Sequence, residues 1–250
     1  MGIHLWESFQ QSLAIVDKNI RIYYSKGPVI IFGLLMPFFL FLAFYIGRNT
    51  SAEALIPGLL GMTAFFTATS VGPAIIPWEA RAKTLERLIS SPVSMRTIFL
   101  GDVLSSFVFG ILVSAVVAVA CLLFGVTVIQ PLLLCFGLVL STFCFASFSI
   151  LLSAYPPTDN PATIMMLSSM IKFPLIFISG VFIPIEQLPS WGRVISLISP
   201  LTYFTDLARY SIQGTSYYSI SVDILALIAF TAAFLFIAIK IHEHTILKRL

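Results

Sequence analysis

The sequence predicts an all-α membrane protein with six transmembrane helices, an N-terminal interfacial helix, and an extracellular re-entrant helical segment between spans five and six. Three observations lead to this fold class. Hydrophobic residues make up 58% of the 250 residues and charged residues only 10%, whereas soluble domains carry about 25% charged residues. The mean hydropathy is +1.01, and apolar runs of about 20 residues, the length that crosses a bilayer, recur six times. A soluble chain of this length has too little interior to bury them.

The six apolar runs are separated by segments rich in turn-forming residues, such as Gly47-Arg48-Asn49 and Gln130-Pro131. Turn chemistry at these positions indicates where one span ends and the next begins. The predicted spans are residues 28–46, 54–78, 97–124, 132–153, 162–183 and 220–240.

The distribution of Lys and Arg predicts the orientation. An even number of spans places both termini on the same side of the membrane. With the N-terminus inside, the inner segments hold ten Lys or Arg residues and the outer segments hold three. Because basic residues accumulate in cytoplasmic loops, both termini are expected in the cytoplasm, with the protein in a plasma or inner cell membrane.

Residues 1–27 precede the first span and show the spacing of an amphipathic helix. The apolar residues recur at steps of three and four positions, which places them on one helical face; they are Trp6, Phe9, Leu13, Val16, Ile20 and Tyr23. Such a helix can lie in the cytoplasmic interface with its aromatic rings at headgroup depth. Packing of the helix against the bundle is the alternative.

Residues 79–96 connect spans two and three on the cytoplasmic side and contain a short predicted helix. Leu85, Leu88 and Ile89 follow the i, i+3, i+4 spacing of one helical face, with charged residues around them. Pro92 ends the helix. A short amphipathic helix suits docking in a groove of another protein, although a solvated loop helix would show the same pattern.

Residues 184–219 lie between spans five and six and contain two short apolar helical stretches, residues 189–198 and 201–213, separated at Pro200. Irregular backbone at membrane depth must be buried in protein or line a wet cavity, so this segment is expected to cap the bundle from outside. Asp206 and Arg209 share one helix face and are expected to pair with each other or with other cap residues. A solvated surface pair is the alternative.

Lys172 lies within predicted span five, about ten residues from either end. A charge at that depth facing lipid costs about 2.5–3.5 kcal/mol, so Lys172 is expected to face the bundle interior or a dimer pathway. Two roles remain open for it. It can attract an anionic substrate, or it can bond to carbonyls and hydroxyls, such as those of Ser168 and Ser169 or of another span.

The sequence lacks the residues that several classes of function require. The sequence has no G-x-x-x-x-G-K-[ST] phosphate-binding motif, and its three histidines lie near the termini, away from any set of metal ligands. No nucleophile–base pair occurs within the spans. The net charge of +3 is too small for a nucleic-acid partner. We therefore expect no catalytic residue, no metal site and no cofactor in this chain.

Two segments resemble signatures of the permease subunits of ABC-2-type transporters, an exporter group that includes drug, sodium and polysaccharide permeases. Residues 84–94 are similar to the family pattern T-L-E-R-L-L-x-x-P-V-S, and Gly101 follows as in the family. Lys83 replaces the Gly that often precedes this pattern, which bears on where the docking helix starts. The outer signature matches Ser179, Gly180, Pro184, Leu188, Pro189, Trp191, Pro200, Leu201, Thr202, Tyr203, Asp206 and Arg209.

This resemblance implies that residues 1–250 form a single ABC-2-type transmembrane domain. Two copies, expected to be a homodimer, would work with two separate ABC ATPase subunits to export a drug-like, lipid-like or glycan substrate. ATP and Mg²⁺ would bind to the ATPase subunits. The residues expected to couple to them are Thr84, Leu85, Glu86, Arg87, Leu88 and Ile89. The alternative function is an ATP-independent secondary carrier or channel, which would favour more intramembrane acids or broken helices.

Overall fold

The computed structural model describes residues 2–46, 52–123 and 125–245, and these residues are helical without any strand. The predicted turn at residues 47–49 and Phe124 lie outside the described residues. In chain order the helices are α1 (Gly2–Asn19), the π-helical turn η1 (Ile20–Tyr24), α2 (Gly27–Ile46), α3 (Ala52–Ala68), α4 (Gly72–Arg81), α5 (Thr84–Ile89), α6 (Met95–Leu123), α7 (Pro131–Ala154), α8 (Pro161–Ile178), the 3₁₀ turn η2 (Ile185–Gln187), α9 (Ser190–Ser196), α10 (Pro200–Gln213) and α11 (Ile220–Thr245).

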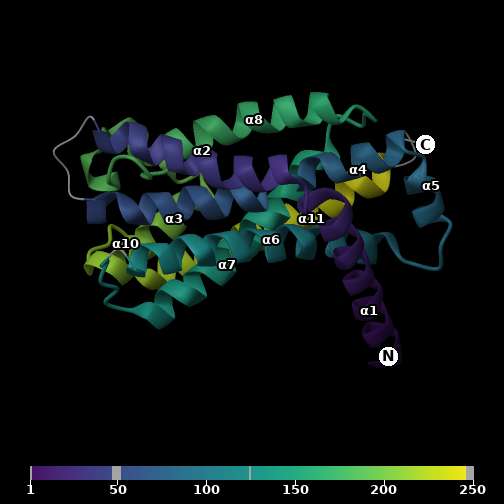
Figure 1. Cartoon of the computed structure of the whole chain (residues 1–250), viewed down its shortest axis with the longest axis horizontal. Coiled ribbons are helices and arrows are strands. Elements are labelled where there is room, and N and C mark those ends of the chain that lie inside the picture. Colours follow the sequence, from purple (N-terminus) through teal and green to yellow (C-terminus); the bar gives the residue numbers. More distant parts are fainter. Residues whose placement is uncertain (1, 47–51, 124, 246–250) are drawn as a thin grey trace.

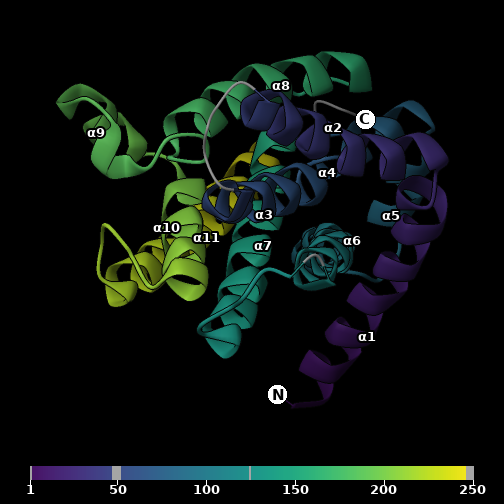
Figure 2. The ribbon, with the colours of Figure 1, turned by 60° about the vertical axis from the view of Figure 1, so that its left-hand side comes forward.

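The long helices run side by side along the longest axis of the molecule, and α1 leaves this bundle at a steep angle (Figure 1). The short helix α5 and the end of α11 lie at one end of the bundle, and α10 lies at the opposite end. Figure 2 shows α9 set apart from the other helices, whereas α10 lies against the bundle. The two segments singled out in the sequence, residues 79–96 and 184–219, are therefore at opposite ends of the molecule.

Five stretches in the described part of the chain are long and apolar enough to cross a membrane. They correspond to predicted spans two to six and comprise Ala54–Arg81, Met95–Leu123, Pro131–Ala154, Pro161–Ile178 and Ile220–Thr245. Helix α2 coincides with the predicted first span. The count of six spans and the re-entrant path of residues 184–219 stay predictions.

Two of these spans differ from the expected helices. Ala54–Arg81 consists of α3 and α4 with a break at residues 69–71. The fifth helix ends at Ile178, whereas the prediction continued it to residue 183. Gly180 has a φ of 75°, a left-handed conformation that stops the helix and that glycine adopts at little cost.

Helix α10 is central to the core although it is too short to span a bilayer. It packs against α3, α7 and α11, and its residues 200–209 are almost all buried. The main apolar cluster joins it to the long helices through Phe204, Phe65 of α3 and Phe145 of α7. By contrast, α9 exposes much of its apolar surface, including Val194.

Helix α1 packs along α6 with one face and exposes the other. The buried face carries Ser12, Ile15 and Asn19. Trp6 and Leu13, two of the apolar residues predicted to share a face, are exposed. The structure shows that the helix contacts the bundle; its place in the membrane interface stays a prediction.

Candidate functional site

Helix α5 is a six-residue helix between α4 and α6. Lys83 precedes it with φ 55° and ψ 22°, in the left-handed region. Glycine takes this conformation freely, whereas a residue with a Cβ atom is strained in it by about 1–2 kcal/mol. Lys83 therefore keeps the backbone geometry that a glycine would favour, and α5 begins where the sequence pattern predicted it.

The apolar side chains of α5 do not form one outward face. Leu85 is 1% exposed and packs against Ile76 of α4 and Phe99 of α6. Ile89 packs at the edge of the same cluster, and Leu88 lines a neighbouring pocket. The structure corrects the expectation that Leu85 lies on a docking face: its burial holds α5 to the bundle.

The outward surface of α5 is polar. Thr84, Glu86 and Arg87 are exposed, and Leu88 is half-buried beside them. The Thr84 hydroxyl donates a hydrogen bond of 3.3 Å to the carbonyl oxygen of Glu79, which ties the start of α5 to α4. A protein that contacts α5 from outside would therefore meet these polar side chains and the edge of Leu88.

A polar junction beneath the N-terminal helix was not identified from the sequence. Lys18 of α1 forms an ion pair with Glu79 of α4, and the next residue, Asn19, donates a 2.6 Å hydrogen bond to Asp102 of α6. Glu79, Asn19 and Asp102 are all buried. The signal available in the sequence was Asp102, an acid within an apolar run. This junction connects α1, the start of the 79–96 segment and the third span.

Lys172 lies on α8, six residues before the helix ends, and therefore about 9 Å from that end. It is nearer to the C-terminal end of its helix than the predicted span implied, because the helix stops at Ile178. Its side chain is 5% exposed and donates a 3.1 Å hydrogen bond to the carbonyl oxygen of Thr69. Thr69 lies at the break between α3 and α4, where the helical hydrogen-bond pattern is interrupted.

A pocket of about 260 Å³ opens beside Lys172 between α2, α3 and α8. An ammonium group has three donors, and the Thr69 carbonyl accepts one of them. The remaining wall of the pocket is mostly apolar and includes Val29, Gly33, Met36, Phe66, Ser70, Met165, Ser169 and Phe173. The structure therefore combines the expected bond to a carbonyl of another span with a cavity that reaches the same charged group.

Asp206 and Arg209 are buried in α10, with exposed fractions of 0% and 5%, so the solvated surface pair is excluded. The described residues contain no ion pair between them; each bonds to backbone of another segment. The Asp206 carboxylate accepts hydrogen bonds of 2.7–3.0 Å from the backbone N–H groups of Tyr217 and Tyr218. Arg209 donates a 3.2 Å hydrogen bond to the Gly180 carbonyl.

Asp206 has opposing electrostatic influences. Burial raises the pKa of its carboxyl, while the two tyrosine amides and the nearby Arg209 act in the lowering direction. Together the bonds of Asp206 and Arg209 join α10 to the turn after α8 and to the loop before α11.

The other residues of the outer signature lie at helix starts and turns. Pro184 immediately precedes η2, Pro189 immediately precedes α9, and Pro200 is the first residue of α10. Proline suits these positions because its φ is fixed and its missing N–H is not required there. Trp191 is 66% exposed on α9, so it is not a core residue of this chain.

Within the described ranges, no group of three or more His, Cys, Asp or Glu side chains could hold a metal ion. One further buried acid was missed in the sequence: Asp223, at the start of α11, is 0% exposed. Neither of its carboxylate oxygens has a hydrogen-bond partner among the described residues.

Comparison with known proteins agrees with the outer and cytoplasmic signatures. The sequence model of the ABC-2 type transporter family matches residues 10–213. A Cyanophora paradoxa protein named as a transport permease, ycf38, is 27% identical over 228 residues, covering 84% of this chain and 77% of that protein. An Escherichia coli (strain K12) protein named as a multidrug ABC transporter permease, YbhR, is 25% identical over 156 residues. That match covers 62% of this chain and 42% of the relative's length.

Proposed function

Because the chain belongs to the ABC-2 type transporter family, we propose that it is the membrane subunit of an ATP-driven exporter. It is a multi-pass membrane protein with at least the five apolar spans described above. In the proposed assembly, two copies of this chain pair and two ABC ATPase subunits bind to them. The ATPase subunits hold ATP and Mg²⁺, and this chain supplies the path across the membrane.

The charge distribution supports an orientation with α5 in the cytoplasm. The end of the bundle that carries α5 collects basic residues from three segments, and such residues accumulate on the cytoplasmic side. They include Lys18, Lys26, Arg81, Lys83, Arg87, Arg96 and Lys240. Both termini then lie in the cytoplasm, and α9 and α10 lie on the outer side of a plasma or inner membrane.

The observation that carries the proposed mechanism is the attachment of α5. Its outward side chains, Glu86 and Arg87, are exposed, while Leu85 is buried against α4 and α6. A force applied to α5 from outside is thus passed to two spans through a packed apolar contact. Since α4 in turn packs against α7 and α8, closure of the ATPase subunits would move several helices together.

We assign the pocket beside Lys172 to the substrate path. Its apolar and aromatic walls suit the hydrophobic part of a drug-like or lipid-like molecule, or the lipid of a lipid-linked glycan. The Lys172 ammonium offers a partner for a negative group on the same molecule. Lys172 bonds to Thr69 at the break between α3 and α4, so its charge lies where helix ends can rearrange.

A test of coupling uses Leu88, the half-buried residue of α5 outside the Leu85 cluster. Leu88→Asp should reduce co-purification of the ATPase subunit at least tenfold, because a charge enters the apolar part of the contact. Leu197→Asp makes the same substitution at an exposed site in the opposite end of the molecule and should leave co-purification unchanged. Equal recovery of the ATPase with both variants would refute the assignment of α5.

A second candidate function, an ATP-independent carrier, has support from the buried acids Asp102 and Asp223, since intramembrane acids often serve proton-coupled transport. Transport in vesicles separates the two functions. Export that requires the ATPase subunit and ATP supports the exporter, whereas export driven by a proton gradient with a hydrolysis-deficient ATPase subunit supports the carrier.

A further inference from the structure

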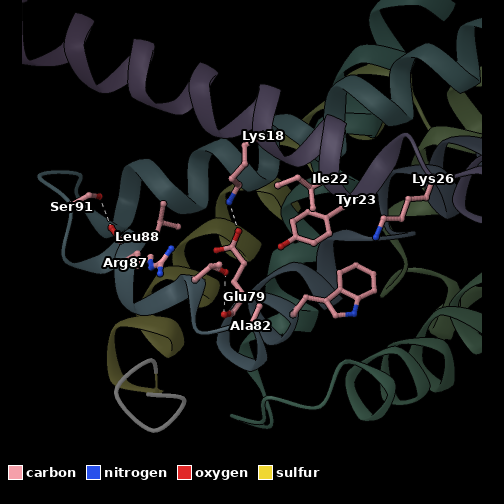
Figure 3. A pocket seen from close by; sticks show the side chains of 11 residues that line it. Lys18, Ile22, Tyr23, Lys26, Glu79, Ala82, Arg87, Leu88 and Ser91 are labelled. Atoms are coloured by element: carbon pink, nitrogen blue, oxygen red, sulfur yellow. Dashed lines mark hydrogen bonds and ion pairs between the residues drawn. The ribbon is translucent and has the colours of Figure 1, made fainter.

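A pocket of about 530 Å³ lies where the N-terminal helix, the end of α4 and α5 meet. It is separate from the cavity beside Lys172 and lies at the α5 end of the bundle. Eleven residues from these three segments and the following turns line it (Figure 3): Lys18, Ile22, Tyr23, Lys26, Trp78, Glu79, Ala82, Thr84, Arg87, Leu88 and Ser91.

The charge of this lining is positive. Lys18, Lys26 and Arg87 contribute three cations, and Glu79 is the only carboxylate among the lining residues. Glu79 is already paired with Lys18. In the described part of the chain, Lys26 and Arg87 have no ion-pair partner. Figure 3 shows the three basic side chains coming from different segments around Glu79 and Tyr23.

The walls between these charges are apolar and aromatic. The rings of Tyr23 and Trp78 stack with centroids 5.3 Å apart and planes inclined by 9°. Ile22 is 46% exposed beside them. An exposed apolar residue next to aromatic rings and lysines is the side-chain composition of the headgroup region of a membrane. Trp78 and Glu79 also lie near the end of a predicted span, which is the depth at which phosphate groups occur.

We propose that this pocket binds the headgroup of an anionic phospholipid from the leaflet at the α5 end of the bundle. The phosphate would be attracted by Lys26 and Arg87, which line opposite sides of the pocket, and the glycerol and upper acyl carbons would contact Ile22 and the Tyr23–Trp78 pair. Free phosphate would satisfy the charges but not the apolar wall. Arg87 and Leu88 also lie on the side of α5 that is assigned to the ATPase subunit, but Lys26 and Ile22 adjoin the membrane-embedded helix α2, which favours a lipid over a docking protein on that side of the pocket.

The proposed lipid would touch three segments that the protein also joins through the Lys18–Glu79 ion pair and the hydrogen bond from the Thr84 hydroxyl to the Glu79 carbonyl. Lys18 and Lys26 flank the turn from α1 to α2, and Arg87 lies on α5. A lipid bound in the pocket would therefore add a contact between α5 and the N-terminal segment. This binding requires membrane insertion of the chain, and it does not depend on an ATPase subunit or on transport.

Fluorescence of Trp78 provides a direct measurement on the purified full chain. The other two tryptophans, Trp6 and Trp191, are replaced by Phe, and the protein is placed in phosphatidylcholine vesicles. Two vesicle preparations are compared. In one, 20 mol% of the lipid, roughly one molecule in five, is phosphatidylglycerol brominated on its acyl chains, and in the other the same fraction is brominated phosphatidylcholine. A basic residue at an anionic surface contributes roughly fivefold in affinity. Two such residues predict that phosphatidylglycerol binds beside Trp78 with an affinity about 25-fold higher than that of phosphatidylcholine.

Substitutions assign this preference to the pocket. Lys26→Gln should lower it to about fivefold, and Lys26→Gln combined with Arg87→Gln should bring it near one. Lys26→Arg keeps the charge and should restore the preference. Arg81→Gln is the matched control, because Arg81 is exposed on the same connecting segment without lining the pocket. Melting temperatures of all variants verify that they are folded.

Three results would overturn the proposal. The first is an equal loss of preference in Arg81→Gln and Lys26→Gln, which would indicate attraction to the whole basic surface. The second is displacement of the lipid by 10 mM inorganic phosphate, roughly a physiological amount, which would indicate a site for free phosphate. The third is loss of the preference when a purified ATPase subunit binds, which would indicate that the pocket belongs to the contact between proteins.

Discussion

Replacing Asp206 by Ala should loosen the end of the molecule that carries α10. The Asp206 carboxylate accepts bonds from the amides of Tyr217 and Tyr218 at 2.7–3.0 Å, and the alanine variant leaves both amides without this acceptor. A hydrogen bond to a charged group contributes about 1.5–3 kcal/mol. These amides are only partly buried, so we take the lower end of that range for each, which gives about 3 kcal/mol.

This loss of stability is measurable by thermal unfolding of the purified chain in detergent. At about 2–4 °C per kcal/mol for a chain of this length, Asp206→Ala should lower Tm by about 6–12 °C. Asp206→Asn retains one acceptor oxygen and should lose about half as much. Limited proteolysis should also cut the loop before α11 faster in the alanine variant, because Asp206 no longer holds that loop.

Asp17 provides the control for this prediction. Its carboxylate bonds to Arg21 at 2.8 Å across one turn of α1, and both side chains are exposed. Such a surface pair contributes about 0.3–0.5 kcal/mol, so Asp17→Ala should leave Tm nearly unchanged. If Asp206→Ala and Asp17→Ala have the same Tm and the same proteolysis rate, the bonds of Asp206 do not hold the outer segment.

Three further predictions concern single positions. Gly58→Ala should lower Tm, because its new Cβ atom would overlap the Val181 carbonyl oxygen at a cost of about 1–3 kcal/mol. Gly192→Ala should leave Tm unchanged, because no atom lies closer than 3.4 Å to its new Cβ atom. Equal Tm values for the two variants would refute this packing. Lys83→Gly should raise the unfolding free energy by about 0.5–1 kcal/mol, because glycine relieves the strain of the positive φ. Lys83→Ala keeps the strain and should leave the unfolding free energy unchanged. A glycine variant that is less stable than the original protein would show that Lys83 is not strained. Lys172→Met should reduce ATP-dependent export of an anionic substrate by about 10- to 150-fold, because a charge-assisted bond of about 1.5–3 kcal/mol is lost, and it should spare a neutral substrate. Unchanged export of both substrates in vesicles would leave Lys172 with a structural role alone.

The sequence was sufficient for the helices and for the family. Apolar runs predicted α2 and five further spans, since the length needed to cross a bilayer is a local property of the chain. Prolines and glycines predicted several helix ends, as at Pro200, where α10 begins. The pattern from residue 84 onward predicted both the short helix α5 and the family, because it depends on residue types at fixed spacing.

The sequence overextended the fifth span and misjudged the environment of individual side chains. Residues 179–183 are apolar enough to continue a span, but Gly180 turns the chain out of the helix. Leu85 has the spacing of a docking residue and is buried in the bundle instead. In a membrane protein the lipid, the core and a partner's groove all accept an apolar side chain, so periodicity alone does not distinguish them.

The polar contacts were decided by the tertiary structure alone. Asp206 and Arg209 are three residues apart, yet each bonds to backbone from another segment, and Lys172 bonds to Thr69, which is 103 residues away in the chain. A buried charge bonds to whichever unsatisfied carbonyl or amide the fold brings within about 3 Å. Such groups occur where helices break or end, and their meeting depends on how the helices pack. The sequence therefore predicted the burial of Lys172, left that of Asp206 and Arg209 open, and missed that of Glu79, Asp102 and Asp223. The packing of α3, α8 and α10 determined the partners of Lys172, Asp206 and Arg209.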